Sequence, residues 1–175
     1  MKHPQCSQRC GYLARCAKGK RVRGMWLQDW KVGTDQVRCR FVAQQVAHTV
    51  RDDTFAGTPP LKFVRLALVL AARLVAGDRR YLVGLWDVSN AFFHASLDEE
   101  VFVIPPSGED EPGVAWQLVK ALYGTRKASK LFQELVISTL VEQGFTRMQV
   151  TIMVFYHVEM AIYIVVRGAE TDTTS

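Results

Sequence analysis

The sequence predicts a mixed α+β fold, and three observations support that class. Two stretches, 61–77 and 128–143, place apolar residues at helical spacing, whereas seven shorter stretches are rich in β-forming residues. Their order is β-β-α-β-β-β-α-β-β, which is not the regular alternation of a parallel βαβ sheet. The 175 residues are 49% hydrophobic, as expected of a globular chain with a packed core.

The first predicted element is a β-hairpin. Residues 24–30 and 36–46 are β-like runs, and 32–35 between them have the composition of a turn. In the second run two sets of residues alternate, so that one face is mostly apolar and the other carries two arginines. The sets are Val37, Cys39, Phe41 and Ala43 on one face and Arg38, Arg40, Val42 and Gln44 on the other.

The remaining elements follow in order. A loop over 48–60 leads to a helix over 61–77, with Pro60 in the first turn and Gly77 as the C-cap. Residues 81–88 are a nearly continuous apolar run, which favours a central strand buried on both faces and ending at Asp87. The rest comprises strands at 101–104 and 114–120, a helix over 128–143 stopped by Gly144, and strands at 150–157 and 160–166.

Positive charge is concentrated at the start of the chain. Residues 1–51 contain 11 of the 22 Lys and Arg but only two acids, Asp29 and Asp35. This asymmetry favours a polyanionic partner, and a solvated basic tail is the alternative. Residues 1–23 are basic and aperiodic, so we expect a disordered lead-in there.

Cysteines and hydropathy give weaker indications. Cys6, Cys10 and Cys16 fit no standard zinc spacing, so we expect free thiols in a reducing compartment. There is no secretory signal, and no stretch approaches the ~20 apolar residues that span a bilayer. We therefore expect an intracellular protein with no membrane partner.

The segment 85–103, LWDVSNAFFHASLDEEVFV, is the most suited to chemistry. Asp87 lies among apolar residues, where a carboxylate is costly to desolvate. Mg²⁺ prefers oxygen ligands, and two such ions could clamp the reacting oxygens of a nucleotidyl transfer. A turn-capping Asp87 is the alternative. Phe92 could cover a nucleotide sugar and exclude a 2′-OH, or else be a core residue with Phe93.

Five blocks carry a family resemblance: VRCRFVAQQ, TFAGTPPLKFVRLALVLAA, WDVSNAFFHASLDEEVFVIPPSG, WQLVKALYGTRKASKLFQEL and EQGFTRM. In order and spacing the sequence resembles the reverse transcriptase of copia-type LTR retrotransposons from about residue 26 to 166. The family pattern includes K-A-R-L-V-A, L-D-V-x-x-A-F-L, L-Y-G-L-K-Q-A-P-R-x-W and Y-V-D-D.

The resemblance implies a partial right-hand polymerase of fingers and palm, with a small antiparallel palm sheet and helices packed on one face. Its regions would be the lead-in 1–23, a fingers-like hairpin and loop over 24–60, and a palm-like region over 61–175. The chain would end just after the second metal-site turn. The implied partners are an RNA template, a DNA primer and deoxynucleoside triphosphates, with two Mg²⁺ ions as cofactors.

The resemblance also assigns roles to single residues. Arg38 and Arg40 match basic fingers positions that contact triphosphate or template. Asp87 matches the first catalytic aspartate, Val88 the residue whose backbone completes that metal site, and Phe92 the sugar gate. Tyr123 and Gly124 match the segment beneath the nascent base pair. Arg126 and Lys127 match the basic positions beside it.

The sequence departs from the family at its second catalytic element. Ala169 and Glu170 occupy the two Asp positions. Ala169 cannot ligate a metal, and Glu170 is one methylene longer at the less essential position, so we expect the chain to be inactive. Milder departures are Ser129 for Pro and Phe132 for Trp. Two alternatives remain: a non-catalytic nucleic-acid-binding remnant, and an unrelated small α+β interaction domain.

Overall fold

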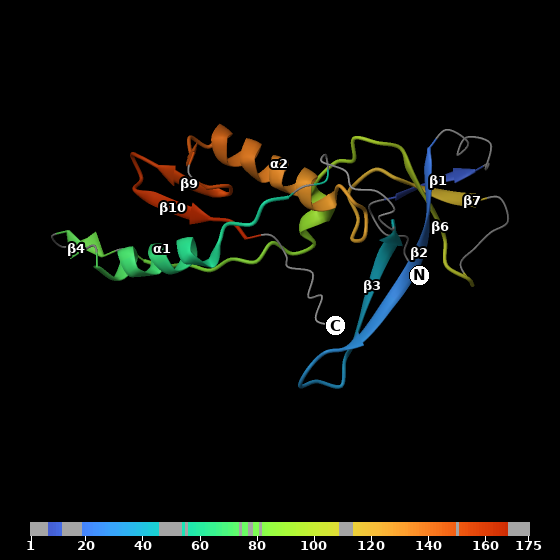
Figure 1. The fold of residues 1–175 in the computed structure, drawn as a ribbon. Coiled ribbons are helices and arrows are strands. Elements are labelled where there is room, and N and C mark those ends of the chain that lie inside the picture. The colour runs from blue at the N-terminus through green and yellow to red at the C-terminus, as the bar shows by residue number, and fades with distance from the viewer. Residues whose placement is uncertain are drawn as a thin grey trace. The chain divides into compact units, whose positions relative to one another are not determined.

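The computed structural model describes residues 7–11, 19–45, 54, 56–73, 75–76, 79–80, 82–108, 114–149 and 151–167. The predicted α+β class is confirmed by a mixed five-stranded sheet, two smaller sheets and two helices (Figure 1). The chain divides into two compact units, Met1–Phe55 with Asn90–Phe132 (unit 1) and Ala56–Ser89 with Gln133–Ser175 (unit 2). In the described residues no helix has the length and apolar character needed to cross a membrane.

Unit 1 is built on the five-stranded sheet, in the order β1-β7-β6-β2-β3. All neighbouring pairs are antiparallel except β2 and β6, which are parallel, so the prediction of an antiparallel sheet is wrong at that pair. Parallel pairing requires a long crossover, and many residues separate these two strands. The strands are β1 (Ser7–Gly11), β2 (Lys20–Trp30), β3 (Val37–Gln44), β6 (Val101–Ile104) and β7 (Val114–Leu118).

The predicted hairpin is confirmed as β2 and β3, paired from Arg23↔Gln44 to Trp30↔Val37. The turn is closed by the amide of Lys31, which donates to the carbonyl of Gln36 at 2.9 Å. The expected lead-in 1–23 differs, because residues 7–11 form β1 and β2 begins at Lys20. Exposed and buried residues alternate around Val22, which is buried and lies opposite Val103. This alternation extends β2 into the basic N-terminal segment. The other lead-in residues lie outside the described ranges, apart from Gly19.

The larger core cluster of unit 1 lies on one face of this sheet, and a smaller cluster of Phe102 and Ala115 is buried on the other. Phe41 is central, with its ring centroid 5.2 Å from that of Trp26 and 5.5 Å from that of Trp116. Phe93 and Leu97 pack against the same cluster from outside the sheet. The buried members are Val22, Phe41, Ala43, Val101, Val103, Trp116, Leu118 and Leu122.

Unit 2 contains most of the second helix and a small antiparallel sheet, whose strand order is β10-β9-β8. Its core joins Phe145, Met153 and Phe155 to apolar residues of the helix. Gly144 ends that helix with φ +85°, a conformation that favours glycine. The elements are α1 (Leu61–Arg73), β4 (Val75–Ala76), β5 (Arg79–Arg80), α2 (Ala128–Glu142), β8 (Thr146–Arg147), β9 (Val154–His157) and β10 (Ile162–Val165).

The prediction of a buried central strand over 81–88 is wrong. Residues 82–88 have no regular secondary structure, and Leu85 and Trp86 are 98% and 85% exposed. A central strand needs a partner on each edge, and none of the three sheets in the described residues includes this run. Both helices and the last strand pair are confirmed, although β9 begins only after a turn at 151–153. The expected C-cap, Gly77, lies outside the described residues.

Candidate nucleic-acid interface

Three segments that carry the sequence blocks meet in unit 1. The end of β3 pairs with the segment after β7, since Ala43 donates to the carbonyl of Tyr123 at 2.8 Å and Gln45 donates to that of Gly124 at 3.3 Å. The segment 95–97 lies on the same stretch, because Ala121 donates to the carbonyl of Ala95 at 2.9 Å. β3, residues 91–97 (the Phe92 segment) and residues 121–124 (the L-Y-G segment) therefore form one hydrogen-bonded assembly.

A tight turn at Leu122–Thr125 fixes this junction. The amide of Thr125 donates to the carbonyl of Leu122 at 3.0 Å, and its hydroxyl donates to the same oxygen at 2.7 Å. Gly124 has φ +84°, as the third residue of a type II turn requires. A Cβ at Gly124 would overlap the backbone oxygen of Ala43. Glycine is therefore needed for both the turn and the close approach of β3.

Aromatic rings pack beside the turn. Phe92 is 7% exposed and lies in the 3₁₀ helix Ala91–His94. Its ring centroid lies 4.7 Å from that of Tyr123 and 6.2 Å from that of Phe132. Tilted and edge-on pairs of this kind add to the stability gained from burial. Phe92, the predicted sugar gate, is thus packed against Tyr123, the residue expected beneath the base pair.

Two lysines join the same segments. Lys127 donates to Asp98 at 2.7 Å, and Lys120 donates to the carbonyl of His94 and to the hydroxyl of Ser96 at 3.2 and 3.0 Å. The Lys127 side chain is 14% exposed. Lys127, predicted to bind nucleotide, is therefore already paired. This pairing could not be predicted from the sequence, because Asp98 belongs to an ordinary run of acids.

The predicted fingers arginines lie on the hairpin. Arg38 and Arg40 are exposed and point to the face opposite the core, because Phe41 and Ala43 alternate with them and are buried. Ala43 is the residue bonded to Tyr123, so one strand carries both the arginines and the junction. Arg126 is half-buried, and its amide donates to Oε1 of Gln45 at 2.8 Å.

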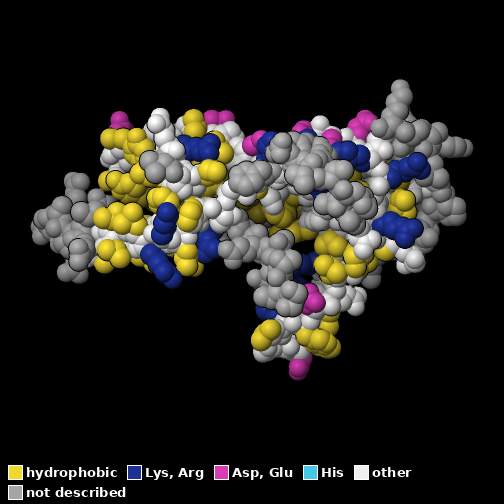
Figure 2. Space-filling view, viewed as in Figure 1, with side chains coloured by type: hydrophobic (Ala, Val, Ile, Leu, Met, Phe, Trp, Pro, Cys, Tyr) yellow, Lys and Arg dark blue, Asp and Glu magenta, His cyan; other side chains and the backbone are white. Residues whose placement is uncertain are grey.

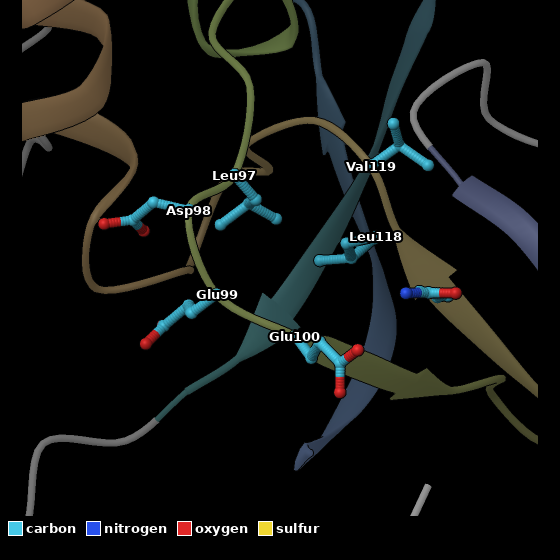
Figure 3. Close-up of a pocket in the computed structure, with 7 residues that line it drawn as sticks. Leu97, Asp98, Glu99, Glu100, Leu118 and Val119 are labelled. Atoms are coloured by element: carbon cyan, nitrogen blue, oxygen red, sulfur yellow. The ribbon is translucent and has the colours of Figure 1, made fainter. Parts of the chain in front are cut away.

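A depression of about 390 Å³ opens between the Asp98 segment and β7, lined by Leu97, Asp98, Glu99, Glu100, Gln117, Leu118 and Val119. In Figure 3, Leu97 and Leu118 point inward, and the carboxylates of Asp98 and Glu99 extend away from them. Glu99 pairs with Lys20. Three acids make this depression unsuited to phosphate, so it does not form part of the candidate interface.

The described structure places only Asp87 and Val88 of the predicted catalytic and metal-site residues. Asp87 and Val88 are exposed in the irregular segment of unit 2, while Ala169 and Glu170 lie outside the described residues. In the described ranges no group of three His, Cys, Asp or Glu residues could hold a metal ion. A two-ion site needs carboxylates from two elements, and position 169 supplies none. The described residues therefore contain no set of side chains that fits the implied pair of Mg²⁺ ions.

Comparison with known proteins identifies the family. The family model described as reverse transcriptase (RNA-dependent DNA polymerase) matches residues 16–167. The chain is 29% identical over 130 residues to the retrovirus-related Pol polyprotein from transposon RE2 of Arabidopsis thaliana, an alignment covering 69% of this chain and 9% of that protein. It is 36% identical over 64 residues to the putative transposon Ty5-1 protein YCL074W of Saccharomyces cerevisiae, covering 35% of this chain and 21% of that protein.

A third relative is the Ty1-NL2 Gag-Pol polyprotein of Saccharomyces cerevisiae, 27% identical over 107 residues, which cover 61% of this chain and 6% of that protein. The chain thus spans less than a tenth of the length of the RE2 and Ty1-NL2 polyproteins. No solved structure matches. Because the family match extends over most of the chain, this protein belongs to the reverse transcriptase family, in its copia-type retrotransposon branch.

Proposed function

We propose that this chain acts as the fingers and palm of a copia-type reverse transcriptase, holding primer and template without efficient nucleotidyl transfer. The observation that carries the proposal is the junction of β3, the Phe92 segment and the L-Y-G turn through main-chain hydrogen bonds. It links the strand of Arg38 and Arg40 to Tyr123 and Gly124, which are the positions assigned to template and nascent base pair.

Individual roles follow from this arrangement. The guanidinium groups of Arg38 and Arg40 would contact template phosphates or the incoming triphosphate. Phe92, fixed by Tyr123 and Phe132, would limit the space beside the sugar of a deoxynucleotide. Arg126 would meet the nucleotide, whereas Lys127 would act mainly by holding the junction through Asp98.

Weak catalysis follows from the carboxylates. Nucleotidyl transfer in this family needs acids that would hold Mg²⁺ ions, whose positive charge would neutralise the charge developing on the transferred phosphoryl group. Asp87 is retained, but Ala169 offers no side-chain oxygen and Glu170 is longer than aspartate. We therefore propose binding without efficient chemistry as the activity of this chain.

The test restores the missing pair by Ala169→Asp with Glu170→Asp. We expect primer extension on an RNA template to appear in the double variant, because both carboxylates would again be present, and to vanish when Asp87→Ala is added. The measurement is product length on a denaturing gel. If the restored variant extends no better than the natural chain, then loss of the aspartate pair is not the cause of inactivity.

A further inference from the structure

Strands β2 and β3 carry four of their five basic residues on one face, and Lys20 is the exception. Arg21 and Arg23 of β2 alternate with buried Val22 and Gly24, so they share the face opposite the core with Arg38 and Arg40 of β3. These strands are fully described, and Asp29 is their one acidic residue. We call this set of four arginines the arginine track.

The register orders the arginine track along the hairpin. Arg40 lies opposite Leu27 and Arg38 opposite Asp29, so the arginines occupy the levels of residues 21, 23, 27 and 29 of β2. At about 3.3 Å per residue, neighbours within each pair lie about 7 Å apart and the whole track spans about 26 Å. Such intervals suit successive phosphates of an extended single strand.

The guanidinium groups are available to a ligand. All four arginines are exposed, and none of their guanidinium groups forms a hydrogen bond or ion pair with another residue in the described part of the chain. Near the turn of the hairpin, the opposite face is apolar instead, with Trp30 72% exposed and Val37 49% exposed. Figure 2 shows hydrophobic side chains gathered on the hairpin at the lower centre of the view. The cations are therefore concentrated where a polyanion would lie.

We propose that Arg21 and Arg23 extend the phosphate-binding surface from the outer half of the hairpin to its base. The arginine track then holds the sugar–phosphate backbone of a single-stranded template along one face of β2 and β3. Planar guanidinium groups bind phosphate oxygens bidentately, and such binding does not depend on sequence. This inference rests on the proposed function, since it names the path of the template on the same hairpin.

The experiment measures how the affinity for a labelled 20-nucleotide single strand, as RNA and as DNA, depends on salt. Each phosphate contact on a single strand contributes a slope of about 0.7 in log K against log salt. Arg21→Gln with Arg23→Gln should lower the slope by about 1.4 and weaken binding at low salt roughly tenfold or more. Arg21→Lys with Arg23→Lys should preserve the slope, because the charge remains.

The matched control removes the same charge elsewhere. Lys62→Gln with Arg65→Gln alters two exposed cations of α1 and should leave the slope unchanged. If the two Gln double variants lowered the salt slope equally, the role proposed for the arginine track would be contradicted. A loss in Arg38→Gln with Arg40→Gln, but none in the Arg21 and Arg23 pair, would overturn this inference and leave the proposed function standing. If the natural chain binds no single strand, the proposed function fails as well.

Discussion

Gly124 is the single residue whose geometry most constrains unit 1. Its φ of +84° belongs to the left-handed region, and its α-carbon lies against the backbone of Ala43. The glycine of the L-Y-G motif is thus required by a backbone-to-backbone approach, which joins the fingers-like strand to the turn after β7. The glycine in this motif therefore has a structural role, which does not depend on contact with nucleic acid.

We predict that Gly124→Ala lowers the free energy of unfolding by about 3 kcal/mol. The left-handed conformation costs about 1–2 kcal/mol, and the overlap with Ala43 adds a cost of the kind caused by overpacking. Urea denaturation followed by circular dichroism measures the change. Gly33→Ala is the control, because Gly33 has φ +78° but no atom within 4 Å of an added Cβ. Its cost should be about 1 kcal/mol, and equal losses would contradict the role of Ala43.

Some site residues could be predicted from the sequence and others could not. Motif order in the sequence assigned roles to Arg38, Arg40, Tyr123 and Gly124, and these roles stay predictions. The ion pair between Lys127 and Asp98 could not be predicted, because a pairing between residues 29 apart depends on the path of the chain. Arg21 and Arg23 had a period-2 signal with Val22 and Gly24, which the segment's basic composition obscured.

At the scale of elements, hydrophobic periodicity predicted both helices, the hairpin and the last strand pair. Periodicity reports which side of a segment is apolar. The hairpin and α2 each have buried residues on one side, whereas the described residues of α1 are exposed or half-buried. The run 81–88 has no such contrast, because apolar residues fill nearly every position. Its state depends on whether neighbouring strands flank it, and the sequence of the run alone does not contain that information. The two-residue strands β4, β5 and β8 are too short to show a period.

Helix α2 offers a test of its buried side in unit 2. Leu140 packs against Phe145, Met153 and Phe155, whereas the adjacent Val141 is 53% exposed. Leu140→Ala should lower the free energy of unfolding by about 2 kcal/mol, because it removes contacts and leaves a cavity. Val141→Ala should change it by no more than about 0.5 kcal/mol. Thermal melting followed by circular dichroism makes the comparison. A larger loss of stability for Val141→Ala than for Leu140→Ala would contradict the buried side assigned to α2.

At the scale of the whole molecule, the residues assigned to one reaction fall in different units. Arg38, Phe92 and Tyr123 belong to unit 1, and Asp87 belongs to unit 2. Unit 1 unites its motifs through main-chain hydrogen bonds, which sequence order alone could not have placed. The family is shown by the match over residues 16–167, and the loss of the aspartate pair at Ala169 and Glu170 is our proposal. The central claim is therefore that nucleic-acid binding is kept and efficient nucleotidyl transfer is lost.

One measurement tests that claim most directly. The natural chain, in excess over a labelled DNA primer annealed to an RNA template, is assayed for binding by fluorescence anisotropy and for extension in the same mixture with Mg²⁺ and deoxynucleoside triphosphates. We predict saturable binding that weakens steeply as salt rises, with no primer lengthened, since position 169 carries alanine. Primer extension by the natural chain, abolished by Asp87→Ala, would contradict the account.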